Sequence, residues 1–171
     1  MMASQGTVVA TDRWGAGPAV AHRSRGRTGH AVVDLIDHAR DGLAHAAGSA
    51  SAGERYAAAH LAALRAGAAV LAARSRPGRS RGRRGRSRGP RNVWVDLAHV
   101  APELAEWAEF FAAGAAKRAA AQAGLPRAVT VREADDMLRD ADSFLSLVCG
   151  LLGLPHQPPL SGAAVGIAGS E

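Results

Sequence analysis

Apolar side chains recur at three- and four-residue steps in four stretches of the chain, which is the spacing of one face of an α-helix. The first stretch begins near Thr28 or Ala31 and ends at Gly48. No stretch shows the two-residue alternation of a half-buried strand. The pattern therefore predicts four amphipathic helices, which cover in order residues 31–48, 51–73, 92–124 and 130–153. The third opens with a short leading turn that carries Trp94, Val95 and Leu97, and Pro102 lies in the first turn of its main part.

Capping signals mark several of these boundaries. Ser51 with Glu54, and Thr130 with Glu133, each have the spacing of a capping box, in which a hydroxyl and a carboxylate satisfy free amides at a helix start. Glycine at 48, 124 and 153 is typical of helix ends. The second and fourth helices are therefore expected to begin at the two capping boxes.

Short links join the first helix to the second and the third to the fourth, so we expect neighbouring helices to pair antiparallel. The expected fold is all-α, an up-and-down four-helix bundle over residues 30–153. Between the second and third helices, residues 75–90 alternate arginine with glycine, serine and proline and predict a long flexible loop. Residues 1–29 and 154–171 lack apolar periodicity and predict a disordered arm and a disordered tail.

Charge is distributed unevenly along the chain. The net charge is +6, yet residues 74–91 hold nine arginines and no acid, so the remainder has a net charge of −3. Such a strip can contact phosphates without reading base sequence, and it makes RNA or another nucleic acid a candidate partner. Compositional drift, or contact with the protein's own acidic helices, would also account for it. The nine candidates are Arg74, Arg76, Arg79, Arg81, Arg83, Arg84, Arg86, Arg88 and Arg91.

Several classes of function find no support in the sequence. Residues 1–29 lack the apolar segment of a signal peptide, and the most apolar run, 145–154, is too short to cross a bilayer, so we expect a cytoplasmic protein with no membrane association. The single cysteine, Cys149, lies in an apolar run and predicts a buried, unreactive thiol. No phosphate-binding loop or dinucleotide fingerprint occurs, and no cofactor is expected.

Arg55 and His60 are the candidate catalytic residues. A neutral imidazole can take the proton of a 2′-hydroxyl while a guanidinium stabilises the charge on the phosphate, so the pair could cleave RNA without a metal. Residues five apart on a helix are separated by ~140°, however, and a single helix does not point both side chains the same way. The alternative is structural: His60 packs between helices beside Tyr56, and Arg55 forms a surface ion pair.

The first helix also carries Asp34, His38, Asp41 and His45 at three- and four-residue steps. These side chains spread over three turns, too far apart to close around one ion. We interpret them as a solvated polar face and expect no metal site.

Three segments resemble a small actinobacterial family of uncharacterised HEPN-domain proteins: ERYAAAHLAALRA (54–66), APELAEWAEFFAAG (101–114) and READDMLRDA (132–141). The resemblance covers roughly residues 31–152. It implies a four-helix HEPN bundle. Active members of that superfamily are metal-independent endoribonucleases, often toxins, that use an Arg-x4-6-His motif, and others are non-catalytic binding or interaction domains.

Carried over to this chain, the motif could fall only on Arg55 and His60. The active pattern usually has a small polar residue after the arginine, where Tyr56 stands here, and usually lies late in the bundle rather than in the second helix. We therefore expect a non-catalytic module that associates with RNA or a partner protein. The alternative is a metal-independent endoribonuclease. Active members assemble their site across a dimer, so the resemblance also implies a possible homodimer.

Overall fold

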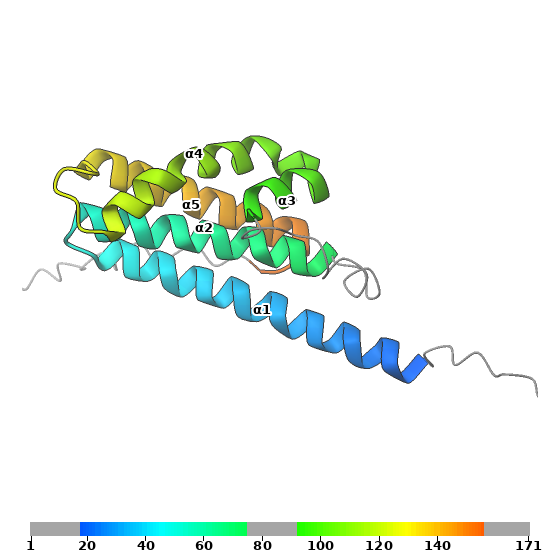
Figure 1. Cartoon of the computed structure of the whole chain (residues 1–171). Coiled ribbons are helices and arrows are strands. Elements are labelled where there is room, and N and C mark those ends of the chain that lie inside the picture. Colours follow the sequence, from blue (N-terminus) through cyan, green and yellow to red (C-terminus); the bar gives the residue numbers. More distant parts are fainter. Residues whose placement is uncertain (1–17, 75–91, 156–171) are drawn as a thin grey trace, which may run out of the picture.

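The computed structural model describes the backbone of residues 18–74 and 92–155, and the side chains of 29–74 and 92–155. These residues form helices and turns and contain no strand, which confirms the all-α prediction (Figure 1). The elements are α1 (Pro18–Gly48), α2 (Ala52–Arg74), α3 (Val93–Val100), the 3-10 helix η1 (Pro102–Leu104), α4 (Ala105–Gln122) and α5 (Val131–Leu152).

The described residues hold five α-helices rather than the four expected, and the additional one is α3. The third helical stretch of the sequence is divided at Ala101. The Asn92 side chain accepts a hydrogen bond from the amide of Trp94 and so begins α3. Pro102 has no amide hydrogen to continue that helix, and it begins the one-turn η1 that leads into α4.

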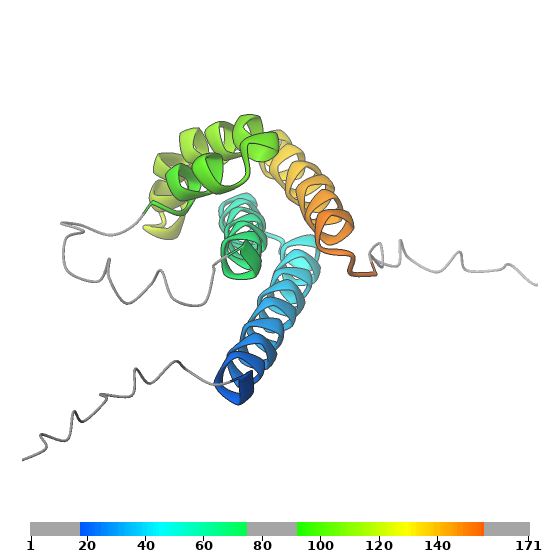
Figure 2. The ribbon, with the colours of Figure 1, turned by 90° about the vertical axis from the view of Figure 1, so that its right-hand side faces the viewer.

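The first helix begins at Pro18, about three turns before the predicted start. Residues 18–29, expected to be part of a disordered arm, are helical. Proline suits the first position of a helix, and extending a helix already nucleated by packing costs little per residue. This early part projects beyond the other helices (Figures 1 and 2). Residues 1–17 lie outside the described residues, as do the expected loop 75–90 and tail residues 156–171.

Helix α2 lies at the centre of the fold and packs against α1, α3, α4 and α5 (Figure 2). Its buried positions are mostly alanine, which lets neighbouring helices approach closely. Gly67 extends this surface, since a Cβ there would lie 3.3 Å from the indole of Trp94 and 3.4 Å from Leu97. Helices α1 and α4 lie on opposite sides of α2, and α1 runs antiparallel to it (Figure 1).

Aromatic rings fill the space where α3, α4 and α5 meet. The centroid of the Phe111 ring lies 5.1 Å from that of Trp94, 5.2 Å from that of Phe144 and 5.9 Å from that of Trp107. These separations are in the range of favourable ring contacts, each worth about 0.5–1.5 kcal/mol beyond the area it buries. The cluster holds α4 and α5 together through side chains.

Helix ends follow the predicted signals closely. The Thr130 hydroxyl accepts from the Glu133 amide while the Glu133 carboxylate accepts from the Thr130 amide, which confirms the second capping box. Gly124 and Gly153 have left-handed φ values of 68° and 67°, as expected of glycine after a helix. At the start of α2, the amide of Glu54 lies 3.4 Å from the Ser51 hydroxyl, a long contact.

Among the described helices, α2 has the length and hydropathy to cross a bilayer, although its sequence was not singled out for this. More than half of that segment is buried by the other helices, 56% of the 18-residue window. The central helix of a helical domain passes the same test of length and composition, so its surroundings identify α2 as a core helix.

Candidate functional site

Arg55 lies in the first turn of α2 and is committed to structural contacts. One guanidinium nitrogen lies 2.5 Å from a carboxylate oxygen of Asp135 on α5, and another donates to the carbonyl of Ser49 at 2.8 Å. The Arg55 side chain is 19% exposed. The guanidinium therefore joins three segments, namely the α1–α2 link, α2 and α5.

His60 lies one and a half turns further along α2 and has no exposed surface. Its Nε2 lies 2.8 Å from the carbonyl oxygen of Phe111 on α4. Because a carbonyl only accepts, Nε2 carries the proton and Nδ1 is the unprotonated nitrogen. The ring is enclosed by aromatic side chains, with centroids 6.4 Å from Tyr56, 6.0 Å from Trp94 and 5.9 Å from Phe111.

The surroundings of His60 favour the neutral imidazole. Burial lowers its pKa from the ordinary value, and the positive charge of Arg118 lowers it further, while the hydrogen bond to Phe111 opposes both. Nδ1 is buried and has no hydrogen-bond partner among the described residues. The ring thus has the protonation state of a general base, but no face open to a substrate.

Gly114 on α4 leaves the space in which the side chains of Tyr56 and His60 pack against this helix. A Cβ at this position would lie 2.9 Å from the Tyr56 hydroxyl and 3.2 Å from Cδ2 of His60. The Tyr56 hydroxyl itself lies 3.5 Å from the Gly114 carbonyl, a long contact. The sequence indicates a Tyr56–His60 pair on α2, whereas Gly114 gave no sign of belonging with it.

The structure does not bring Arg55 and His60 together. Arg55 reaches Asp135 on α5, whereas His60 reaches Phe111 on α4, as the ~140° between positions five apart requires. Within one chain these side chains therefore serve two different helix–helix contacts. This geometry corresponds to the structural alternative weighed for the pair.

Of the nine arginines in the basic strip, Arg74 lies within the described residues. It is the last residue of α2, forms an ion pair with Glu103 of η1 and donates to the carbonyl of Val100 at 3.0 Å. The pair lowers the pKa of the Glu103 carboxyl. Arg74 therefore stabilises the contact between the end of α2 and the α3–η1 junction. The other eight, from Arg76 to Arg91, lie outside the described residues.

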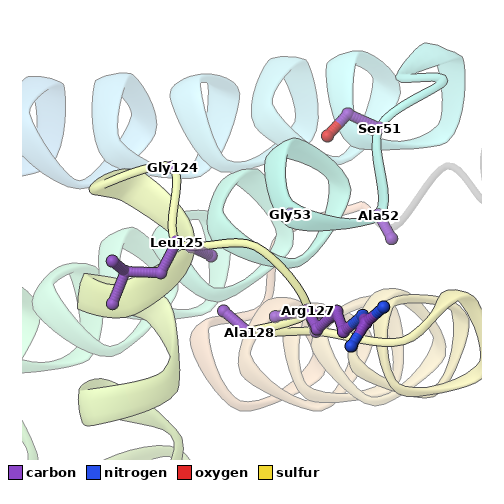
Figure 3. A pocket seen from close by; sticks show the side chains of 9 residues that line it. Ser51, Ala52, Gly53, Gly124, Leu125, Arg127 and Ala128 are labelled. Carbon is purple, nitrogen blue, oxygen red and sulfur yellow. The ribbon is translucent and has the colours of Figure 1, made fainter.

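A shallow pocket of about 280 Å³ lies where the start of α2 faces the α4–α5 turn (Figure 3). Gly53 and Ser51 line one side, and Leu125 and Arg127 line the other. Arg127 has a φ of 63°, which few non-glycine residues adopt. Both helix ends were predicted, but their meeting is a tertiary feature that no local signal encodes. Apart from Ser51 and Arg127, its lining residues are small or aliphatic, and the surface of the pocket is more polar than apolar.

The comparisons with known proteins agree with the fold. Residues 46–149 match the model of the SAV_6107-like HEPN family, from the end of α1 to near the end of α5. The chain belongs to this HEPN family. The resemblance seen in the sequence is thereby confirmed. No curated protein and no solved structure matches the chain.

The polar residues Asp34, His38, Asp41 and His45 lie along α1 in this HEPN domain. His38 Nδ1 lies 2.6 Å from the backbone carbonyl of Asp34, one turn earlier on the same helix. Within the described parts of the chain, no three histidine, cysteine or acidic side chains lie close enough to hold a metal ion.

Cys149 is fully buried on α5, as expected. Burial raises the pKa of its thiol, although the nearby Arg40 guanidinium, 3.9 Å from the sulfur, opposes the shift. A thiol that is both enclosed and protonated is not a nucleophile.

Proposed function

We propose that this chain is a non-catalytic HEPN module of the cytoplasm that binds RNA through its arginine-rich segment 74–91. In this proposal α1, α2, α4 and α5 form an up-and-down four-helix scaffold, and the segment between α2 and α3 supplies the contacts to phosphate. A protein partner for the same segment is the alternative occupant.

The burial of His60 is the observation that supports a non-catalytic function. A general base must come within hydrogen-bond distance of the proton it removes, and this imidazole has no exposed surface and already donates to Phe111. Arg55, the candidate phosphate ligand, pairs with Asp135 and Ser49 instead. The endoribonuclease alternative would require both side chains to leave these contacts.

The distribution of charge along the chain supports binding of RNA by residues 74–91. The chain from 92 to 153 carries nine acids against five lysines and arginines, so the helical body is mildly acidic while the segment 74–91 is strongly basic. An acidic body repels phosphate, and a basic segment attracts it. The segment contains no aromatic residue on which bases could stack, so the expected binding is electrostatic and insensitive to base sequence.

Catalysis is tested by incubating the purified protein with RNA in the presence of a chelator. We expect the RNA to stay intact with the wild type, with His60→Ala and with Arg55→Ala. Cleavage by the wild type that both variants lose would overturn the non-catalytic assignment. Circular dichroism of each variant separates loss of activity from loss of fold.

Binding is tested by gel shift against single-stranded RNA at several salt concentrations. The matched control has the same length, with the eight arginines from 76 to 91 replaced by glutamine and Arg74 kept for its pair with Glu103. We expect the wild type to bind with log K falling by about 0.7 per phosphate contact as log salt rises, and the control not to bind. Equal binding by both would refute the role of the segment, and absence of binding by both would favour a protein partner.

A further inference from the structure

Helices α4 and α5 carry apolar side chains that are exposed to solvent. Phe110 is 43% exposed, Leu147 is 45% exposed and Leu151 is 39% exposed. Trp107 is half-buried, and its ring centroid lies 6.3 Å from that of Phe110 on the same helix and 5.6 Å from that of Phe144 on α5. We call the surface formed by Trp107, Phe110, Leu147 and Leu151 the α4–α5 face.

The residues of the α4–α5 face share one side of each helix. Leu147 and Leu151 lie three and seven residues beyond Phe144 on α5, so they continue the side of α5 that meets Trp107. Phe110 is three residues beyond Trp107 on α4. Isolated exposed apolar residues are ordinary, but aromatic and leucine side chains that adjoin one another are typical of contact surfaces.

Two carboxylates lie beside these apolar side chains. Glu106 precedes Phe110 by four residues and Asp140 precedes Phe144 by four, a spacing that makes side chains neighbours on a helix surface. Neither carboxylate forms a hydrogen bond or ion pair with another described residue. Glu106 is exposed, whereas Asp140 is half-buried, and burial together with the charge of Asp136 raises the pKa of the Asp140 carboxyl. A cation brought to this place would offset the burial of that acid.

The lysine and arginines of the same two helices are already engaged elsewhere. Lys117, Arg132 and Arg139 each form an ion pair with an acid of α5. The fourth cation, Arg118, has a buried Nε, and its charge lowers the pKa of His60, so it lies near α2. The unpaired charge at the α4–α5 face is therefore negative.

This combination of side chains fits a segment that is both apolar and basic. Aliphatic side chains of such a segment can pack on Phe110 and Leu147, while its lysines or arginines reach Glu106 and Asp140. Aromatic rings beside a carboxylate also attract a cation. The same face of a second copy would oppose carboxylates with carboxylates, and the phosphates of RNA would be repelled. Charge therefore selects a basic protein segment as the partner.

We propose that the α4–α5 face binds a basic amphipathic helix of a partner protein. Aliphatic side chains of that helix pack on the apolar side chains of the face, and its cationic side chains pair with Glu106 and Asp140. The partner thus supplies the cations that these two carboxylates lack within the described part of the chain. The proposal does not depend on binding of RNA by residues 74–91.

Fluorescence anisotropy with a synthetic peptide tests the binding. The probe is a labelled peptide about five helical turns long, with leucine at steps of three and four residues and lysine at the other positions. Its control has glutamate in place of every lysine. We expect the full-length chain to bind the lysine peptide with a micromolar dissociation constant and not to bind the glutamate peptide.

Substitutions on the face test the apolar contacts. Phe110→Ser and Leu147→Ser are each expected to raise the dissociation constant at least about tenfold, as loss of a central apolar contact does. Val33→Ser is the matched control, because Val33 is 43% exposed but lies on α1, and we expect it to leave the affinity unchanged. All three side chains are exposed, so circular dichroism should show unchanged helicity.

Neutralising the two carboxylates tests the charged contacts. Glu106→Gln combined with Asp140→Asn is expected to weaken binding of the lysine peptide about two- to fivefold at low salt and to reduce its salt dependence, as loss of exposed ion pairs does. Asp41→Asn is the matched control, because Asp41 is an exposed acid on α1 that forms no ion pair with another described residue. It should change neither the affinity nor its salt dependence.

A lysine peptide that fails to bind would overturn the proposal, as would binding that Val33→Ser weakens as much as Phe110→Ser does. Sedimentation velocity that shows a wild-type dimer, dissociated by Phe110→Ser, would assign the face to a second copy instead. Tighter peptide binding after replacement of the eight arginines from 76 to 91 by glutamine would assign it to the chain's own basic segment. A gel shift with Phe110→Ser, expected to equal that of the wild type, keeps these results separate from the proposed binding of RNA.

Discussion

The guanidinium of Arg55 lies 2.5 Å from a carboxylate oxygen of Asp135, and this ion pair joins the first turn of α2 to the second turn of α5. Arg55 precedes Asp135 by 80 residues. The pair therefore closes a contact between distant parts of the chain. The same guanidinium, a candidate phosphate ligand in the sequence, also donates to the carbonyl of Ser49 at the α1–α2 link. Arg55 therefore has a structural role in this fold.

Arg55→Ala is expected to lower the free energy of unfolding by about 1.5–3 kcal/mol, the usual range for hydrogen bonds to a charged group. The loss should exceed that of Asp135→Asn, which keeps the contact with Ser49 and leaves Arg55 partly exposed. Urea denaturation of both variants measures the difference. Equal or greater loss in Asp135→Asn would contradict a role of Ser49 in holding the side chain.

His60 predicts a dependence of stability on pH. Its folded pKa lies below the ordinary value of 6.5, so below that value the unfolded chain binds a proton that the folded chain resists. Stability from this group is complete above about 6.5 and falls as the pH drops from there toward the folded pKa. Unfolding free energies measured from pH 7.5 down to 5 check this.

The matched variant for that measurement is His60→Gln, because an amide can still donate to the Phe111 carbonyl and does not titrate. We expect its unfolding free energy to vary less with pH than that of the wild type, while remaining lower at neutral pH. The other histidines are common to both proteins and cancel in the difference. Identical pH profiles would show that His60 is not the source of the acid sensitivity.

Much of the fold could be predicted because its signals are local. Periodicity located the helical stretches, and the Thr130–Glu133 box and the glycines at 124 and 153 fixed three helix ends within a residue or two. The predicted start of α1 was wrong. Residues 18–29 show no helical periodicity of their own, and their helix continues from the packed part of α1. The separate α3 was read as a leading turn, since a single break at Ala101 leaves the apolar spacing nearly unchanged.

The candidate site could be predicted less well, since it depends on which helices meet. The sequence located Arg55 and His60 on one helix and showed that they diverge, but not that Asp135 and Phe111 receive them. Gly114, which makes room for Tyr56 and His60, was not singled out from the sequence. Contacts between helices 50 or more residues apart leave no trace in a local pattern.

Gly114→Ala is expected to destabilise the fold by about 1–3 kcal/mol, even though alanine is the better helix former. The added Cβ would lie 2.9 Å from the Tyr56 hydroxyl and 3.2 Å from His60 Cδ2, so both rings must move. Gly150→Ala on α5 is the control, because nothing lies within 4 Å of its Cβ position. There the substitution should raise stability by about 0.5–1 kcal/mol. A gain in stability at both positions would show that α2 and α4 have room to separate.

The last prediction concerns the contribution of Glu133, in the first turn of α5, to stability at low pH. The Lys117 side chain, 2.5 Å away, lowers the pKa of this carboxyl most, and hydrogen bonds from the Thr130 amide and hydroxyl lower it further, to about 2. The charged form is thus favoured by folding, so its contribution is present above pH 4.5 and is lost as the pH falls from 4.5 toward 2. Glu133→Gln should flatten the acid limb of the stability profile over that interval.

Thr130→Ala separates the cap from the ion pair. It removes the hydroxyl that accepts from the Glu133 amide and should cost about 1 kcal/mol at neutral pH, as loss of a helix cap does. It leaves Lys117 beside Glu133, so most of the acid dependence should remain, because the lysine lowers the pKa more than the threonine does. Profiles of unfolding free energy from pH 2 to 7 for wild type, Thr130→Ala and Glu133→Gln would show the two effects. An acid limb abolished by Thr130→Ala would assign the shift to the cap, since the ion pair survives that substitution.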